Sequence, residues 1–163
     1  MERNDIYTPG ITDYKIMHML AVARKCYTLA REKYELSETT ARKCFVMGLL
    51  HDIGYEFSDS AATHPEVGAE MLNSLNVSQI CAIVDAVRSH GKIHEMEHVT
   101  KLDYILNEAD LTVDSKGNNV SIEERLDDIK GRYGKSSTQY KDALSVTKML
   151  VELEERMIED NDC

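Results

Sequence analysis

The chain has 163 residues, 42% of them hydrophobic, which fits one domain with one hydrophobic core. Its formal net charge of −10 argues against non-specific binding to nucleic acid or to an anionic membrane, since both require clustered Lys and Arg. A small phosphorylated partner remains open, because bound divalent cations reverse the local charge. Two prolines, eight glycines and little strand-like alternation favour an all-α fold.

The cysteines and the first residues predict a reducing, cytoplasmic setting. The four cysteines form no CxxC pair, and the first three lie in apolar helical patterns, which is typical of buried free thiols. They are Cys26, Cys44, Cys81 and Cys163. The segment 1–10 lacks the apolar stretch of a signal peptide, and no stretch reaches the about 20 apolar residues of a membrane span.

The hydrophobic pattern predicts an all-α bundle of about six to seven helices. A first helix over about 12–34 and a second ending near Leu50 are apolar on nearly every side, which is typical of buried helices. Ser37 is the expected N-cap of the second helix. The third helix is expected to open at His64-Pro65, since proline is well suited to a first helical turn.

The second half of the chain continues in the same way. Ser78 is the expected cap of a fourth helix, and Ser121 with Glu124 forms a capping box for a sixth. The expected elements are a helix from Ser78 to Gly91, a polar loop over 91–98, a helix over about 100–113, a flexible loop over 114–119, and two C-terminal helices over about 121–159.

Six His and Asp side chains fall on the apolar faces or ends of these helices. They are His18, His51, Asp52, His64, His90 and Asp110. Buried imidazoles and carboxylates are costly unless they are paired or bound to metal. One buried histidine is usually a satisfied core residue, but six such groups on five elements, without a Lys or Arg partner, indicate a divalent metal site.

The ligand types narrow the choice of metal. Imidazole nitrogen and carboxylate oxygen without thiolate suit Fe, Mn, Co or Ni, and are compatible with Zn, rather than Ca. Six protein ligands are too many for one catalytic ion, which needs open positions. They suit two ions per chain, bridged by a carboxylate and a water or hydroxide.

The order of these residues resembles the HD-domain metalloenzyme superfamily. Residues 49–54, Leu-Leu-His-Asp-Ile-Gly, look like the HDIG signature, and residues 64–69 look like the HxxxGA segment of its small members. Ser89-His90-Gly91 and Glu108-Ala109-Asp110 match the later motifs in order. The resemblance covers about residues 12–115 of an expected single domain over 1–163.

This resemblance implies an orthogonal helical bundle with a two-metal phosphohydrolase site. The first metal would be held by His18, His51, Asp52 and Asp110. Asp52 would bridge to a second metal, completed by His64 and His90, which gives these three residues catalytic roles. The implied reaction is attack of a metal-bound hydroxide on a phosphate ester or anhydride of a small molecule, such as a nucleotide.

Two positions do not follow the family pattern clearly: the residue after the HDIG-like segment and the last metal ligand. Many relatives have a lysine just after HDIG, but this chain has Tyr55, so the cationic group near the substrate is unassigned. Asp103 and Asp114 are alternatives for the last ligand. We prefer Asp110, because it fits the family text and lies four residues after Leu106 on the buried face.

Candidate substrate contacts follow the fourth helix. Lys92 could contact phosphate, and His94 could protonate a leaving group, although a solvated loop is the commoner interpretation of such residues. Arg125 and Arg132 could reach the site from the sixth helix, and the acidic end of the last helix is expected to be solvated.

Two other functions use the same features. A diiron oxygenase employs the same six ligands, although a short chain without an extra substrate domain favours hydrolysis. A non-catalytic module could keep the fold, but such modules often lose ligands and this chain keeps all six. Pairing of the last helix with a second copy would give a homodimer.

Overall fold

The computed structural model describes residues 11–161, and over that range the chain is all-α. The helices are α1 (Asp13–Glu32), α2 (Glu38–Leu50), α3 (His64–Ser74), α4 (Cys81–Ser89), α5 (Lys101–Leu111), α6 (Ile122–Tyr133) and α7 (Thr138–Asn161). Short 3-10 turns lie at Ile53–Glu56, Ser78–Ile80 and Ile93–Glu95. None of the described helices combines the length and apolar character needed to cross a bilayer.

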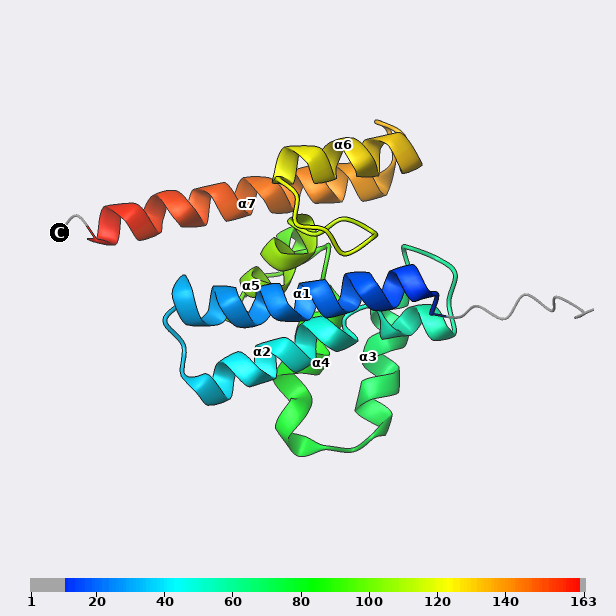
Figure 1. Ribbon diagram of the computed structural model, residues 1–163, viewed down its shortest axis with the longest axis horizontal. Helices are drawn as coiled ribbons and strands as arrows, with labels where there is room; N and C mark the ends of the chain where they lie inside the picture. The colour runs from blue at the N-terminus through cyan, green and yellow to red at the C-terminus, as the bar shows by residue number, and fades with distance from the viewer. Residues whose placement is uncertain (1–10, 162–163) are drawn as a thin grey trace, which may run out of the picture.

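The helices form two groups joined by α5. In Figure 1, α1 crosses the middle of the molecule, with α2, α3 and α4 below it and the pair of α6 and α7 above. α5 packs against α1 and also against α7, so it links the lower group to the C-terminal pair. The arrangement agrees with the helical bundle that the sequence predicts.

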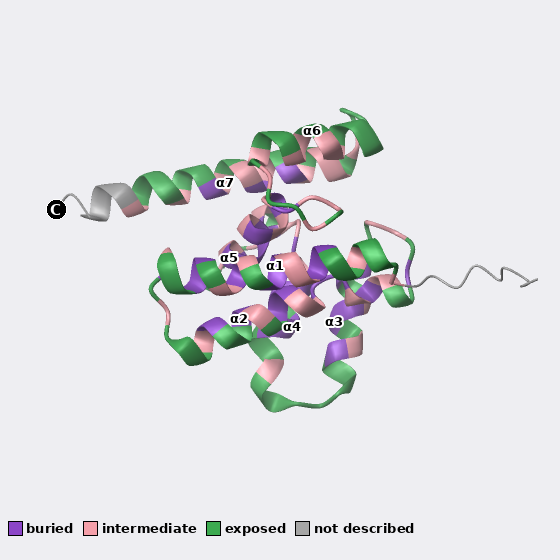
Figure 2. Cartoon of the chain, viewed as in Figure 1, coloured by how far each residue is buried: buried purple, intermediate pink, exposed green. Residues whose placement is uncertain are grey.

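Two apolar clusters hold these groups together. The larger lies between α1, α2, α4 and α5, and includes Val22, Cys26, Met47, Val87, Ile105 and Leu106. The smaller joins α5 and α7 through Ile93, Leu111, Ala143, Val146 and Leu150. Each fully buried aliphatic side chain contributes about 1.5–3 kcal/mol, so the larger cluster dominates stability. Figure 2 shows the buried positions concentrated where helices meet.

Most predicted helix starts are confirmed by hydrogen bonds. The hydroxyl of Ser37 accepts from the Thr40 N–H at 3.2 Å and caps α2. Ser121 and Glu124 form the expected capping box of α6, with each side chain accepting from the other's N–H. These starts are local signals, because Ser and Thr oxygens satisfy N–H groups that the first turn leaves free.

The expected cap at Ser78 is wrong. α4 begins at Cys81, and Ser78 instead opens a 3-10 turn without capping a helix through its side chain. The Ile80 N–H donates to the Val77 carbonyl at 3.2 Å, so a backbone bond closes this turn.

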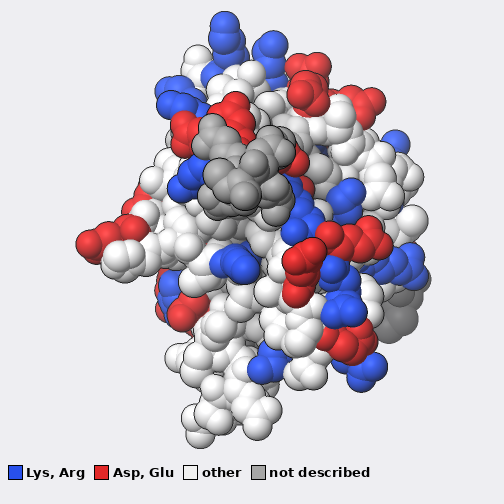
Figure 3. All heavy atoms as spheres, turned by 90° about the vertical axis from the view of Figure 1, so that its left-hand side faces the viewer, with Lys and Arg blue, Asp and Glu red and all other residues white. Residues whose placement is uncertain are grey.

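In Figure 3 the uncharged lobe at the bottom is this α3–α4 connection, and acidic and basic side chains are interspersed over much of the remaining visible face.

Two predicted loops contain more structure than a polar pattern indicates. Ile93, in the segment 91–98, is 0% exposed and packs in the α5–α7 cluster, which fixes the chain after α4. The segment 114–119 is closed by Asp114, whose Oδ1 accepts from the N–H groups of Lys116 and Asn118, both at 2.8 Å. These contacts position both segments next to α1 and α7.

The close approach of α1 and α2 depends on Gly48. A Cβ at this position would lie 2.7 Å from the Cα of Ala23 and 2.9 Å from the Sγ of Cys26. Backbone atoms cannot move aside as a flexible side chain can, so the two helices must separate to admit a methyl group. Because the Gly48 carbonyl lies in the turn that ends at His51, this contact also sets the position of His51.

We predict that Gly48→Ala lowers the free energy of unfolding by roughly 1–3 kcal/mol, the usual cost of overpacking a core. Urea denaturation followed by circular dichroism measures the change. Gly131→Ala is the matched control, because a Cβ there meets nothing within 4 Å. That helical substitution is expected to be neutral or to stabilise by about 0.5–1 kcal/mol. A Gly48→Ala protein as stable as the wild type contradicts the packing argument.

Candidate metal centre

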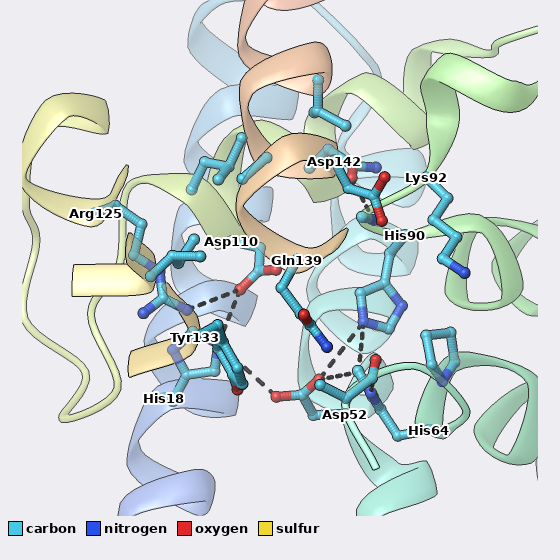
Figure 4. A pocket seen from close by; sticks show the side chains of 18 of the residues that line it. His18, Asp52, His64, His90, Lys92, Asp110, Arg125, Tyr133, Gln139 and Asp142 are labelled. Atoms are coloured by element: carbon cyan, nitrogen blue, oxygen red, sulfur yellow. Dashed lines mark hydrogen bonds and ion pairs between the residues drawn. The ribbon is translucent and has the colours of Figure 1, made fainter. Parts of the chain in front are cut away.

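Six His and Asp side chains from different parts of the chain converge at one buried point. The Nε2 of His18 lies 3.0 Å from Asp110 Oδ1, and the Nε2 of His64 lies 3.0 Å from Asp52 Oδ1. The Nε2 atoms of His51 and His90 lie 3.4 and 3.5 Å from the same Asp52 oxygen. Figure 4 shows Asp52 facing His64 and His90, with Asp110 between His18 and Arg125.

The local structure places these groups by the ends of helices. His51 is the C-cap of α2, and His90 is the C-cap of α4. His64 is the first residue of α3, held against the turn after Asp52 by Gly54. A Cβ on Gly54 would overlap the His64 carbonyl, so only glycine lets the turn and α3 approach this closely.

All four histidines donate their Nδ1–H to a backbone carbonyl. The pairs are His18 with Asp114 at 2.8 Å, His51 with Gly48 at 2.7 Å, His64 with Ala61 at 3.0 Å, and His90 with Val87 at 2.6 Å. A carbonyl only accepts, so each Nδ1 carries the proton and each neutral ring keeps its lone pair on Nε2. Metal-binding histidines are oriented in the same way by an outer partner.

Two contacts fit a cation at the centre. The Nε2 of His51 is buried and has no hydrogen-bond partner. The Nε2 atoms of His64 and His90 face one another at 3.0 Å, which places two lone pairs together when both rings are neutral. A buried unsatisfied polar atom costs about 1–3 kcal/mol, and a divalent ion removes this cost by accepting the lone pairs.

The ligand atoms fall into overlapping groups that could hold a metal ion. One group contains His18, His51 and Asp110, and another contains His51, Asp52 and His90; the ligand atoms of each group lie within 4.8 Å of one another. Their donors are imidazole nitrogens and carboxylate oxygens, which suit divalent transition metals.

The comparison with protein families agrees with this site. A family model described as HD domain matches residues 16–129, which includes most of α1, all of α2 to α5 and most of α6. The chain belongs to the HD-domain family. No match to a curated protein or to a solved structure was found. HD domains bind divalent metals and are typically metal-dependent hydrolases, and the His/Asp cluster of this chain is compatible with both properties.

The carboxylates of this HD domain remain ionised although they are buried. Burial raises the pKa of Asp52, but His51, His64 and His90 together lower it further, so the pKa lies well below its usual range. For Asp110, burial is likewise outweighed by His18 and His51, and its pKa is well below the ordinary value. The negative charge needed to bind a cation is therefore retained near neutral pH.

The histidines respond to the same charges in two ways. Burial lowers the pKa of His51 and of His90, but the nearby Asp52 and Asp110 carboxylates outweigh burial and raise both values above the ordinary histidine pKa. For His64, burial dominates and the pKa is lowered despite its hydrogen bond to Asp52. When His51 and His90 are protonated, their charges partly balance the carboxylates.

The two alternative aspartates have other partners. Asp103 belongs to the capping box of α5, where its Oδ2 accepts from the Thr100 N–H at 2.8 Å. Its Oδ1 accepts from the Ser89 hydroxyl at 3.2 Å. Asp114 orders the following turn through its own carboxylate. Asp110 is therefore the residue of this trio whose side chain reaches His18 and His51.

A cavity of about 170 Å³ opens over the cluster. Lys92 lines it beside His90, on the opposite side of the histidines from Arg125 (Figure 4). His94 does not line this cavity, and its Nε2 instead lies 3.3 Å from an Asp142 oxygen. The structure therefore brings Lys92 to the site and places His94 behind Asp142.

Sequence reasoning missed several residues of the cavity wall. They are Tyr55, Asn107, Tyr133, Gln139 and Asp142. Asn107 gave a readable signal, because it is a polar residue directly after the apolar pair Ile105-Leu106. Its Oδ1 accepts from the Gly91 N–H at 2.7 Å and fixes the backbone after His90. Tyr55 directly follows the HDIG-like segment, which could have pointed to it, whereas Tyr133, Gln139 and Asp142 lie in segments whose polar pattern indicates solvent.

We predict that binding of a divalent ion releases protons near pH 6.5, because His51 and His90 have raised pKa values and must lose their protons to become ligands. Affinity should therefore fall as the pH decreases through these raised values. Calorimetric titration with Mn²⁺ in buffers of different ionisation enthalpy counts the protons. His98→Ala, at an exposed site, should behave as wild type. Equal affinity at pH 6 and pH 8, without proton release, contradicts this prediction.

Proposed function

We propose that this HD domain is a phosphohydrolase that binds two divalent metal ions and cleaves a phosphate ester or anhydride of a small molecule. The observation that carries the proposal is the convergence of four inward-facing Nε2 atoms on two ionised carboxylates. The expectation that the cluster has no Lys or Arg partner is wrong, because Arg125 Nη2 forms an ion pair with Asp110 Oδ1 at 3.9 Å. This single cation among the described residues still leaves two ionised carboxylates short of positive charge.

The geometry supports a division of the ligands between two ions. His18, His51, Asp52 and Asp110 are proposed for the first ion. Asp52 is proposed to bridge to the second, because its Oδ1 lies within 3.5 Å of the Nε2 atoms of His51, His64 and His90. His51 belongs to both overlapping groups, so it lies between the proposed positions.

The bound ions would supply an activated water and a clamp on the phosphoryl oxygens. The protein's own residues contribute orientation and access. The Nδ1–carbonyl bonds hold each ring so that its Nε2 stays directed at the centre. Asn107 holds the backbone at Gly91, and Tyr133 and Gln139 line the cavity opposite Asp52 (Figure 4).

The cavity supports a small substrate with a mixed polar and apolar surface, such as a nucleotide. Its wall combines Gln139 and Asp142 with the apolar side chains of Leu111, Ile129 and Val146. Lys92 is proposed to contact the substrate, as the sequence indicates. Asp142, rather than His94, lines the cavity, and His94 is proposed to orient the Asp142 carboxylate.

The first test is turnover without oxygen. We expect hydrolysis of bis-p-nitrophenyl phosphate, or of a member of a nucleotide and sugar phosphate panel, by Mn²⁺-loaded protein under anaerobic conditions. Asp52→Asn should reduce the rate by at least about 100-fold, because loss of outer partners of metal ligands alone costs about 10- to 100-fold. Asp127→Asn, on the exposed face of α6, is the matched control. Activity that requires oxygen, or no turnover of the panel at full metal loading, contradicts the proposal.

The second test counts the ions. We expect near two metal ions per chain after anaerobic purification, and one or fewer in His64→Ala or His90→Ala, because both residues are proposed ligands of the second ion. Metal analysis by mass spectrometry gives the count, with His98→Ala as the control that keeps both ions. If either variant loses all metal, or keeps both ions, the division of ligands is wrong.

A further inference from the structure

We propose that the site has a second anion-binding half, formed by Lys15, Arg125 and Arg132, and that the substrate is therefore a phosphoanhydride with two adjacent phosphoryl groups. This inference rests on the proposed phosphohydrolase function and names its substrate class. The phosphorus attacked would lie at the His/Asp cluster, and the neighbouring phosphoryl group would lie against the three cations.

A second hollow shares part of its lining with this cavity, including Asp52. It measures about 280 Å³ and is lined by Lys15, Asp59, Ser115 and Arg132. Both spaces are lined by His18, Asp52, Tyr55, Arg125 and Tyr133. His18 and Asp52 of the cluster therefore lie where the two spaces meet, so that one molecule can occupy both with its reacting atom beside the cluster.

Lys15 is held in the second hollow by two stacked rings. Its Nζ lies 3.0 Å from the centroid of the Tyr55 ring, a cation–π contact. Tyr55 in turn stacks on His64, with centroids 4.0 Å apart and an interplanar angle of 13°. The residue after the HDIG signature is thus not itself cationic, but its aromatic face positions a cation from α1 next to the cluster.

Arg125 and Arg132 are held as a pair by one carboxylate of α6. Asp128 accepts from Arg125 Nη1 at 2.9 Å and from Arg132 Nε at 3.1 Å. Arg132 also donates to the Ser115 hydroxyl. Arg125 lines both spaces, and its Nε is buried without a hydrogen-bond partner, so its binding capacity is not fully used by Asp128.

The charges favour a multiply charged anion over a neutral group. Asp59 and Asp128 offset two of the three cations, which leaves an excess of positive charge in a chain whose net charge is −10. Asp52 and Asp110 are assigned to the metal ions. Donors that approach from α1 and from α6 suit the several oxygens of a phosphoryl group better than one planar carboxylate.

Hydrolysis of a phosphoanhydride does not require an acid that protonates the leaving group. Water adds to the phosphorus at the cluster and the bridging P–O bond breaks, so the leaving group departs as a phosphate while a proton is released to solvent. The developing charge on the leaving oxygen falls beside Lys15 and Arg125, where cations stabilise it. This accounts for the position of His94 outside the cavity, since a phosphate leaving group does not require protonation.

Two non-hydrolysable probes test the inference. Methylphosphonate offers one phosphoryl group and methylenediphosphonate offers two, and both are supplied as Mg²⁺ salts so that neither removes bound ions. Calorimetric titration of metal-loaded wild type is compared with Lys15→Gln and Arg132→Gln. Arg24→Gln on α1 and Lys130→Gln on α6 are the matched controls, since both residues are exposed and neither lines the two spaces.

We expect methylenediphosphonate to bind wild type roughly tenfold or more tightly than methylphosphonate, as one added charge-assisted contact predicts. Lys15→Gln and Arg132→Gln should lose most of this preference while keeping their affinity for methylphosphonate and their melting temperature. The controls should keep the preference. Retention of the preference in both variants, or its absence in wild type, overturns the inference but leaves the proposed hydrolase standing. Failure of the metal-loaded protein to bind either probe overturns both.

Discussion

The structure depends on one constraint: each buried imidazole must be oriented so that its Nε2 faces the centre of the His/Asp cluster. Three of the four histidines are oriented in the same way, since His51, His64 and His90 each donate Nδ1–H to the carbonyl three residues earlier. At the ends of α2 and α4 these carbonyls lack a partner within the helix. The histidine therefore completes the end of its own helix and is oriented by doing so, and the free Nε2 is left for a metal.

The packing of the helices positions the carbonyl groups that orient these histidines. Gly48 lets α2 approach α1, and its carbonyl is the acceptor that orients His51. Gly54 brings the turn after Asp52 against the start of α3, where His64 lies. His18 is oriented from a distance instead, by the carbonyl of Asp114 in the turn after α5. A change in any of these helix contacts is transmitted to the centre, because the acceptors belong to the same backbone as the contacts.

The sequence predicts the helices and the convergence of the cluster well, because both follow from local signals. Ser37 and the Ser121–Glu124 box act within one helical turn, and a histidine within or at the end of an apolar run must face inward. Ser78 fails because a backbone turn closed by Val77 and Ile80 competes with its hydroxyl. Tyr133, Gln139 and Asp142 of the cavity wall are missed because they lie on α6 and α7, whose polar pattern does not identify the neighbour that a partly exposed residue meets.

α6 lies outside the part of the bundle that carries the His/Asp cluster. The six proposed metal ligands lie on α1 to α5 or next to them, within or beside the larger apolar cluster, where small shifts would cost both stability and the geometry of the His/Asp cluster. α6 packs only partly, through Ile122, Leu126 and Ile129 against the smaller cluster. Its arginines are positioned by Asp128 rather than by burial in a core. Under the proposed anion-binding role, substitution of Arg132 on α6 would change anion binding without altering the packing around the cluster, whereas substitution of Lys15 would act from α1, the helix that also carries His18.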